Sequence, residues 1–232
     1  RSLVACHKFD RALSLWHEAD LDGSLREVGG TLNQQIWFTA MAWKAYLGDQ
    51  VMANNVNLFL TSLGRHMKTR ASGLIYSQVF GIPRRFGPLR DLVTKLRSRS
   101  ERYLIDSAYQ IFTLLGLAFL YKNFSRHAFF KSRIFNKALS FCFTRRLEEA
   151  IASSLFGYGY NVPGFELPFI QSVFSKELPE ESSLVAKRVY SHQIERHFSG
   201  CTGGLLACNA FDNETLAARI YEICRLDERW EF

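Results

Sequence analysis

The segment TLNQQIWFTAMAWKAYLGD, residues 31–49, decides the class of fold. Thr31 is a favourable residue for the start of a helix, and Gly48 is of the type that commonly ends one. Between them the apolar side chains recur at the spacing of one helix face: Ile36, Trp37, Ala40, Met41, Trp43, Ala45 and Leu47. The pattern therefore predicts a helix that begins at Thr31 and stops at Gly48.

A second helical pattern follows after only the short turn Gly48-Asp49. Its apolar residues extend from Val51 to Leu63, and Gly64 marks its end. Two helices joined by so short a turn must lie antiparallel. Similar patterns predict further helices at about 101–123, 131–152, 168–174, 180–198 and after Asp212.

Two segments interrupt the helical pattern. Asp22-Gly23, within residues 16–27, has the chemistry of a tight turn and predicts a small β-hairpin. Ser72-Gly73, followed by Leu74-Ile75, predicts another turn with a short extended piece. We therefore predict an all-α fold of antiparallel helical hairpins with short β-hairpin loops.

The composition indicates one globular unit. The chain has 232 residues, of which 47% are hydrophobic and 14% aromatic, enough for one substantial core, and no segment has the composition of a linker. We therefore treat residues 1–232 as a single helical domain. The longest apolar run, residues 111–121, is shorter than the roughly 20 residues that a membrane span needs, so we expect no span.

The five cysteines are odd in number and widely spaced. This pattern argues against a disulfide framework and against a zinc site, so we expect no metal. Residues 1–10 carry no signal-peptide pattern, and together with the free thiols this predicts a cytoplasmic protein. The chain also lacks a Walker-type glycine loop, a Rossmann fingerprint and a nucleophile elbow, so we expect no cofactor.

The net charge of +7 favours anionic partners. Seven basic and two acidic residues lie between Arg84 and Arg102. Such a run is either a solvated helix face or a surface that faces an anion. Nucleic-acid binding is the least favoured interpretation, because the run lacks interleaved aromatic residues and any known reading motif.

The segment GYGYNVPGFELPF, residues 157–169, is aromatic, rich in glycine and stiffened by proline. We interpret it as a loop that forms a platform for a sugar. Tyr158 and Tyr160 would stack on the sugar ring, Asn161 would bond its hydroxyls, and Glu166 would act as acid or base. The alternative is a structural loop whose aromatic rings fill the core and whose Glu166 caps a helix.

Polar residues also enter two of the predicted helices. Asn33 and Gln35 lie just before Trp37, and consecutive amides in so apolar a helix need partners, which predicts that they line a cleft. Capping of the helix explains part of this pattern. Tyr103 and Asp106 share a face of the helix at 101–123, where a buried carboxylate needs donors whether or not it reacts.

Two further candidates lie near the C-terminal end of the chain. His192 is three residues before Glu195 on a predicted helix with arginines nearby, which indicates either a proton-transfer pair beside an anion clamp or ordinary surface residues. Arg219 lies in an apolar stretch. A buried guanidinium needs a carboxylate, such as Glu222 or Glu166, or would instead reach a sugar oxygen.

Four stretches of the chain resemble a known family: GGTLNQQIWFTA (29–40), SGLI (72–75), YNVPGFELPF (160–169) and DNETLAARIYE (212–222). Within a series of helical hairpins they look like the α/α toroid of the N-acylglucosamine 2-epimerase superfamily and related glycoside hydrolases. The resemblance implies a ring of hairpins in which histidines and acidic residues transfer protons while arginines and aromatic rings hold a sugar. A complete ring needs a longer chain, so we expect a partial one, with the alternative that it is the later part of a longer toroid.

The function expected from these patterns is that of a carbohydrate-active protein, a sugar epimerase, isomerase or glycoside hydrolase. The candidate catalytic residues are Glu166, Asp106 and His192, and the candidate substrate-binding residues are Asn33, Gln35, Trp37, Tyr103, Tyr158, Tyr160, Asn161 and Arg219. The partner would be a small carbohydrate or a sugar phosphate. The alternative is a non-catalytic helical carbohydrate-binding or scaffold module, which we would expect if these side chains form separate local contacts rather than converge.

Overall fold

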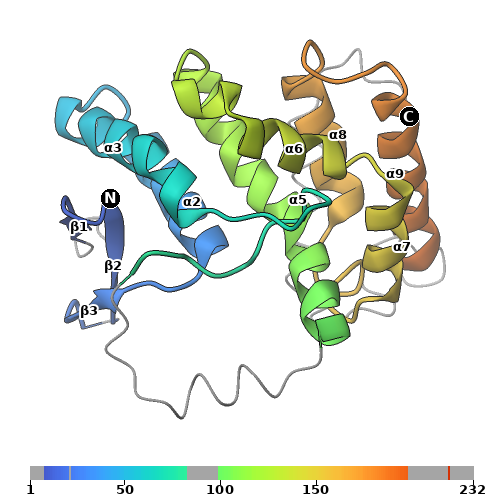
Figure 1. Ribbon diagram of the computed structural model, residues 1–232, viewed down its shortest axis with the longest axis horizontal. Helices are drawn as coiled ribbons and strands as arrows, with labels where there is room; N and C mark the ends of the chain where they lie inside the picture. The colour runs from blue at the N-terminus through green and yellow to red at the C-terminus, as the bar shows by residue number, and fades with distance from the viewer. Residues whose placement is uncertain (1–7, 21, 83–98, 198–218, 220–232) are drawn as a thin grey trace.

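The computed structural model describes residues 8–20, 22–82, 99–197 and 219, and the described part is mostly helical with one small sheet (Figure 1). The strands are β1 (Phe9–Asp10), β2 (Leu15–Ala19) and β3 (Leu25–Val28). The helices are α2 (Leu32–Ala45), α3 (Gln50–His66), α5 (Arg99–Phe124), the 3-10 helix η1 (Ala128–Lys131), α6 (Arg133–Phe141), α7 (Arg145–Ser153), α8 (Pro163–Val173) and α9 (Ser182–His197). The basic run between Arg84 and Arg102 lies outside the described residues as far as residue 98, and so does the predicted last helix except for Arg219.

The first predicted helical hairpin is confirmed. Helix α3 follows α2 after a four-residue turn and packs back against it. Asp49 begins α3 by accepting a hydrogen bond from the Met52 amide at 2.7 Å. Thr31 occupies the N-cap position of α2, but its side chain makes no capping hydrogen bond.

The predicted β-hairpin is also confirmed, and β1 extends it into an antiparallel sheet in the order β1-β2-β3. Gly23 turns the chain between β2 and β3 with a φ of +85°, a conformation that glycine adopts without steric cost. Figure 1 shows this sheet at one end of the molecule beside α2 and α3, with α7 and α9 at the other end.

Helix α5 is the centre of the fold. It packs against α2 on one side and against α7 and α8 on the other, and α9 covers α8. Gly116 lets α2 and α5 approach closely, because a Cβ atom there would lie 2.8 Å from Cγ2 of Ile36. Among the described residues, α5 has the length and composition to cross a membrane, but 67% of its most apolar 18-residue stretch is buried inside the protein, as in a core helix.

The single helix predicted at 131–152 is wrong. The chain instead forms η1, α6 and α7, and residues 142–144 separate the last two helices. Thr144 interrupts the helix, because its hydroxyl accepts a hydrogen bond from the Leu147 amide at 3.3 Å and donates one to the Phe141 carbonyl at 2.8 Å. A threonine hydroxyl can bond nearby backbone groups and so compete with the helical hydrogen bonds. The apolar spacing continues across the break, so it gave no sign of this interruption.

The predicted loop at 157–169 is a loop only as far as Val162. Helix α8 begins at Pro163, five residues earlier than predicted, and carries Pro168 inside it. Proline suits the first position of a helix because its φ is already helical and its missing N–H has no helical partner there. Gly164 then packs against α9, where a Cβ atom would lie 2.4 Å from Cβ of Gln193.

Candidate functional site

The largest group of candidate residues gathers around Phe112 in the middle of α5. Trp37 of α2 stacks on the Phe112 ring with centroids 4.7 Å apart, and its Nε1 donates to the Phe112 carbonyl at 2.9 Å. The Arg219 guanidinium lies 5.1 Å from the centre of the same ring and pairs with Glu166 of α8. Glu166 is fully buried, whereas 13% of the Arg219 side chain is exposed. An aromatic ring and a charge pair therefore face each other at the junction of α2, α5 and α8.

Three more rings extend this group toward solvent. Tyr109 meets Phe112 and Phe156 at centroid distances of 6.5 and 6.3 Å, and Phe156 lies 5.9 Å from Tyr160. Tyr160 is 41% exposed and Phe156 39%. We call Trp37, Tyr109, Phe112, Phe156 and Tyr160 the aromatic cluster.

Two features set the properties of the exposed end of the aromatic cluster. Burial raises the pKa of Tyr109, and the nearby Tyr160 raises it further, so the Tyr109 phenol stays neutral and can donate a hydrogen bond. Asn161 shapes the loop from beneath, because its amide donates to the carbonyls of Ala108 at 3.1 Å and Phe156 at 2.7 Å. The predicted hydrogen-bonding residue Asn161 thus bonds the backbone and holds Phe156 in place.

Asp106 and Tyr103 form a second group, one to three turns along α5 from Phe112. Asp106 is buried as predicted, but its partners are the Arg70 guanidinium at 3.0 Å and the Ser77 amide at 3.1 Å. Tyr103 contacts Arg70 through its ring, and its hydroxyl accepts from Nε of Arg146 at 3.0 Å. The group is a carboxylate held by an arginine and a backbone amide.

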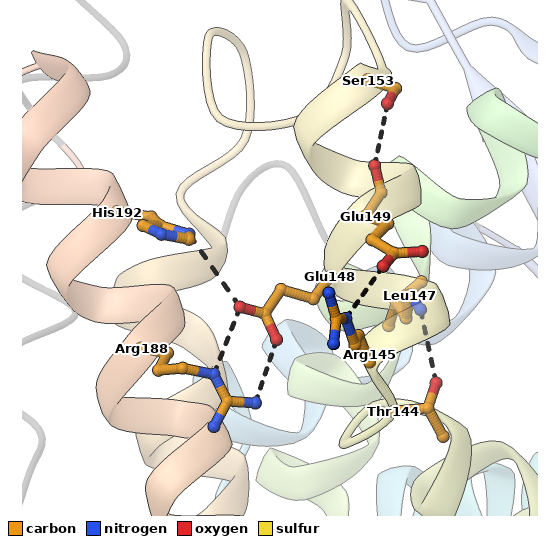
Figure 2. Close-up of polar contacts among 8 residues, drawn as sticks. All are labelled: Thr144, Arg145, Leu147, Glu148, Glu149, Ser153, Arg188 and His192. Atoms are coloured by element: carbon orange, nitrogen blue, oxygen red, sulfur yellow. Dashed lines mark hydrogen bonds and ion pairs between the residues drawn. The ribbon is translucent and has the colours of Figure 1, made fainter.

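His192 belongs to a third group, shown in Figure 2. Its partner is Glu148 of α7 and not the predicted Glu195: His192 Nδ1 lies 4.0 Å from Glu148 Oε1. Arg188 holds the same carboxylate from α9, with Nη2 at 3.1 Å from Oε2. Glu148 was not among the sequence candidates, because its partners lie on another helix, α9, and only the packing of α9 beside α7 brings them together.

Tyr158 adjoins this third group from the core side. Its ring is only 1% exposed and meets His192 edge-on at 6.4 Å, while the Arg196 guanidinium lies 5.1 Å from the ring centre. Burial raises the pKa of Tyr158, and the Glu148 carboxylate raises it further, so the phenol stays protonated. The structure therefore uses Tyr158 to fill the space between α7 and α9.

Gln35 lies on the other side of α2 from Trp37, at the sheet. Gln35 accepts from the Trp16 amide at 2.8 Å and donates to the carbonyls of Trp16 at 2.8 Å and Gly29 at 3.2 Å. Asn33 is buried at the start of the helix, and its oxygen accepts from the Gln34 amide at 2.9 Å. The amide of Gln35 holds the β-hairpin against α2.

The candidates thus fall into separate groups of contacts. The largest contains Trp37, Tyr160, Asn161, Glu166 and Arg219; the second contains Tyr103 and Asp106; the third contains Tyr158 and His192; Gln35 lies at the sheet and Asn33 at the start of α2. Within residues 8–20, 22–82, 99–197 and 219, no three His, Cys, Asp or Glu side chains lie together as metal ligands. The aromatic cluster with Glu166 and Arg219 is therefore the candidate functional site.

Comparison with known proteins gives one similarity that covers nearly the whole chain. The chain is 29% identical over 239 residues to the protein named archaeal glycosylation protein Q of Haloferax volcanii, and the alignment covers 96% of the chain and 63% of that protein. The chain therefore spans less than two thirds of that relative's length. No protein-family model matches the chain, and no solved structure is significantly similar to it.

Proposed function

We propose that this protein binds and acts on a carbohydrate in a glycosylation pathway. The name of the Haloferax volcanii relative supports the pathway. The observation that carries the proposal is the position of Arg219 over the Phe112 ring, paired with the buried Glu166 and bordered by the partly exposed rings of the aromatic cluster. Aromatic faces suit the C–H surface of a sugar ring, and a guanidinium suits its oxygens.

The proposed reaction class is proton transfer at the sugar, as in an epimerase, an isomerase or a glycoside hydrolase. Glu166 is the proposed acid or base. Glu166 has no exposed surface, so a sugar reaches its carboxylate only if groups that cover it move. In this proposal Arg219 shifts to bind an oxygen of the sugar and thereby exposes Glu166. Asp106 and His192 are the other proposed proton-transfer residues, each on a different side of α7.

A second candidate function is a non-catalytic carbohydrate-binding module. It is favoured by the separation of the candidates, because Asp106, His192 and Gln35 each make contacts apart from Glu166 and Arg219. It is also favoured by a feature that the three groups share: an arginine faces each carboxylate, in the pairs Glu166–Arg219, Asp106–Arg70 and Glu148–Arg188. An arginine stabilises the ionised form of a carboxylate, which suits a fixed binding surface better than a proton donor.

The arrangement of helices supports the proposal of a partial α/α toroid. Helices α2, α5 and α8 form a continuous row, while α3 packs against α2 and α9 against α8. Along the chain, α3 follows α2 and α9 follows α8, so a helix of the row is followed by the helix that covers it. This is the order expected of successive hairpins in such a ring. We propose that the aromatic cluster lies on the face of these hairpins that α2, α5 and α8 form.

Removal of the Tyr160 ring tests binding at the aromatic cluster. A thermal-shift screen of neutral hexoses, N-acetylhexosamines and sugar phosphates identifies a ligand, since one at 100 times its Kd stabilises the folded state by about 2.7 kcal/mol. Tyr160→Ala is expected to weaken that ligand about tenfold, because stacking on an aromatic ring is lost. The control is Leu155→Ala, five residues earlier in the same loop and 71% exposed. If both variants bind the ligand with the same affinity, the aromatic cluster is not part of the binding site.

Glu166→Gln separates catalysis from binding. With the ligand from the screen as substrate, the variant is expected to lose about 10²- to 10⁴-fold in kcat/KM, because a glutamine transfers no proton. It should still melt cooperatively, since glutamine keeps a hydrogen-bond acceptor for Arg219. A wild-type rate would exclude Glu166 as the proton-transfer residue. If the unsubstituted protein binds the ligand without converting it, the binding module is the better description.

A further inference from the structure

An open hollow of about 660 Å³ lies along α6, away from the aromatic cluster. It is lined by Ser72, Lys131, Arg133, Asn136, Lys137, Ser140, Phe141 and Thr144. Three of these side chains are cationic, four others carry hydroxyl or amide groups, and none is acidic. The hollow is therefore a concentration of positive charge surrounded by neutral hydrogen-bond donors.

The arrangement of α6 explains why these groups face the same space. Arg133, Lys137 and Ser140 are three or four residues apart, so they project from one face of the helix. Lys131 precedes the helix at the end of η1, and Thr144 follows it at the start of α7. One short helix thus presents a row of donors with further donors at both ends.

Among the described residues, no carboxylate pairs with the charges of the hollow. Elsewhere in the described part of the chain, arginines such as Arg70, Arg145 and Arg188 are paired with acidic side chains. None of the ion pairs between described residues includes Lys131, Arg133 or Lys137. Their positive potential is therefore available to an anion from solution.

The opposite wall of the hollow is held firmly in place. Gly73 has a φ of +106° and lies so close to α6 that a Cβ atom would stand 2.3 Å from the Lys137 carbonyl oxygen. Gln110 ties the same two elements together, because its amide donates to the Ala138 carbonyl at 3.0 Å and accepts from the Ile75 amide at 2.8 Å. Ser72 is therefore fixed opposite the cations before any ligand arrives, which lowers the entropic cost of binding.

We infer that this hollow binds the phosphate group of a phosphorylated small molecule. A phosphate carries up to two negative charges on three oxygens, which matches three cations with hydroxyl and amide donors beside them, and arginine binds such oxygens in a bidentate manner. A neutral sugar would not use the charges. A polynucleotide is a weaker match, because bases need exposed rings on which to stack, and Phe141, the one aromatic residue that lines the hollow, is only 3% exposed. The inference uses no residue of the aromatic cluster and stands apart from the function proposed above.

Titration calorimetry in 150 mM NaCl tests the inference with inorganic phosphate, glucose 1-phosphate, uridine diphosphate and a 20-nucleotide single-stranded DNA as probes. The variant is Lys131→Gln/Arg133→Gln/Lys137→Gln. The control is Lys68→Gln/Arg126→Gln/Lys176→Gln, three exposed cations outside the hollow. Both triple variants lower the net charge by three, so general electrostatic attraction changes equally.

The expected result is saturable one-site binding of at least one of the three phosphate compounds by the unsubstituted protein and the control. The hollow variant should weaken that binding about 30-fold or more, because it loses three charge-assisted contacts. The compound bound most tightly identifies whether the phosphate belongs to a free ion, a sugar or a nucleotide. The inference is overturned if none of the three compounds binds, if both variants lose affinity equally, or if only the DNA binds. Loss of phosphate binding with an intact sugar response at the aromatic cluster would leave the proposed function untouched.

Discussion

Gly73→Ala is expected to lower the free energy of unfolding by about 2–5 kcal/mol. The φ of +106° at Gly73 is a conformation that a residue with a Cβ atom adopts only with strain. In addition, the new methyl group would meet the Lys137 carbonyl oxygen at 2.3 Å and Cβ of Phe141 at 2.9 Å, so α6 and the Ser72 turn must move apart. Urea unfolding followed by circular dichroism measures the change.

Gly64→Ala is the matched control for this prediction. Gly64 lies within α3, and an added Cβ atom would meet nothing within 4 Å. Alanine there is expected to raise the free energy of unfolding by about 0.5–1 kcal/mol, because it loses less backbone entropy than glycine in a helix. The two glycines should therefore respond with opposite signs. A loss of less than 1 kcal/mol in Gly73→Ala would show that the turn is not locked against α6.

Gln35→Leu is expected to lower the free energy of unfolding by about 2–4 kcal/mol, because each buried polar group left without a partner costs about 1–3 kcal/mol. The leucine nearly conserves the volume but leaves the Trp16 amide and the carbonyls of Trp16 and Gly29 without the side chain that bonds them. Since Gln35 is 3% exposed, water does not readily replace it. The β-hairpin should loosen while α2 and α5 remain packed.

Hydrogen exchange distinguishes this local effect from a general loss of stability. The Trp16 amide should exchange faster in Gln35→Leu by a larger factor than amides in the middle of α5. The neighbouring Gln34 is exposed, so Gln34→Leu should change the free energy of unfolding by no more than about 0.5 kcal/mol. Uniformly faster exchange over the whole chain would contradict the proposed role of Gln35 as a clamp on the hairpin.

Much of the fold could be predicted from local patterns. The apolar spacing between Thr31 and Gly48 indicates a helix wherever it packs, and Asp22-Gly23 indicates a turn because glycine readily adopts a positive φ. The break at Thr144 could not be predicted in this way. The apolar stripe on both sides of it is continuous, and only the packed structure shows that its hydroxyl bonds two backbone groups.

The candidate site could be predicted only in part. Charge and burial suggested that Arg219 would need a carboxylate and named Glu166 as one choice, and the structure pairs them. For His192 the spacing allowed either a pair with Glu195 or an ordinary surface residue; in the structure its side chain is 46% exposed and lies near Glu148 of another helix. Spacing along one helix detects neighbours on that helix, but it carries no information about the helix that packs against it.

Local sequence patterns indicated most of the helices, the turn of the β-hairpin, and which side chains are too polar to be buried alone, but they missed the start of α8 and the break between α6 and α7. These follow from backbone conformation and solvation, which act over a few residues. The partners of those polar groups depend on the tertiary structure: Gln35 holds the sheet, Tyr158 fills the core, and Lys131, Arg133 and Lys137 surround a hollow without an ion-pair partner among the described residues. Such partners are distant in the chain and meet only when the helices pack, because each buried charge or amide takes the nearest group that the packing offers.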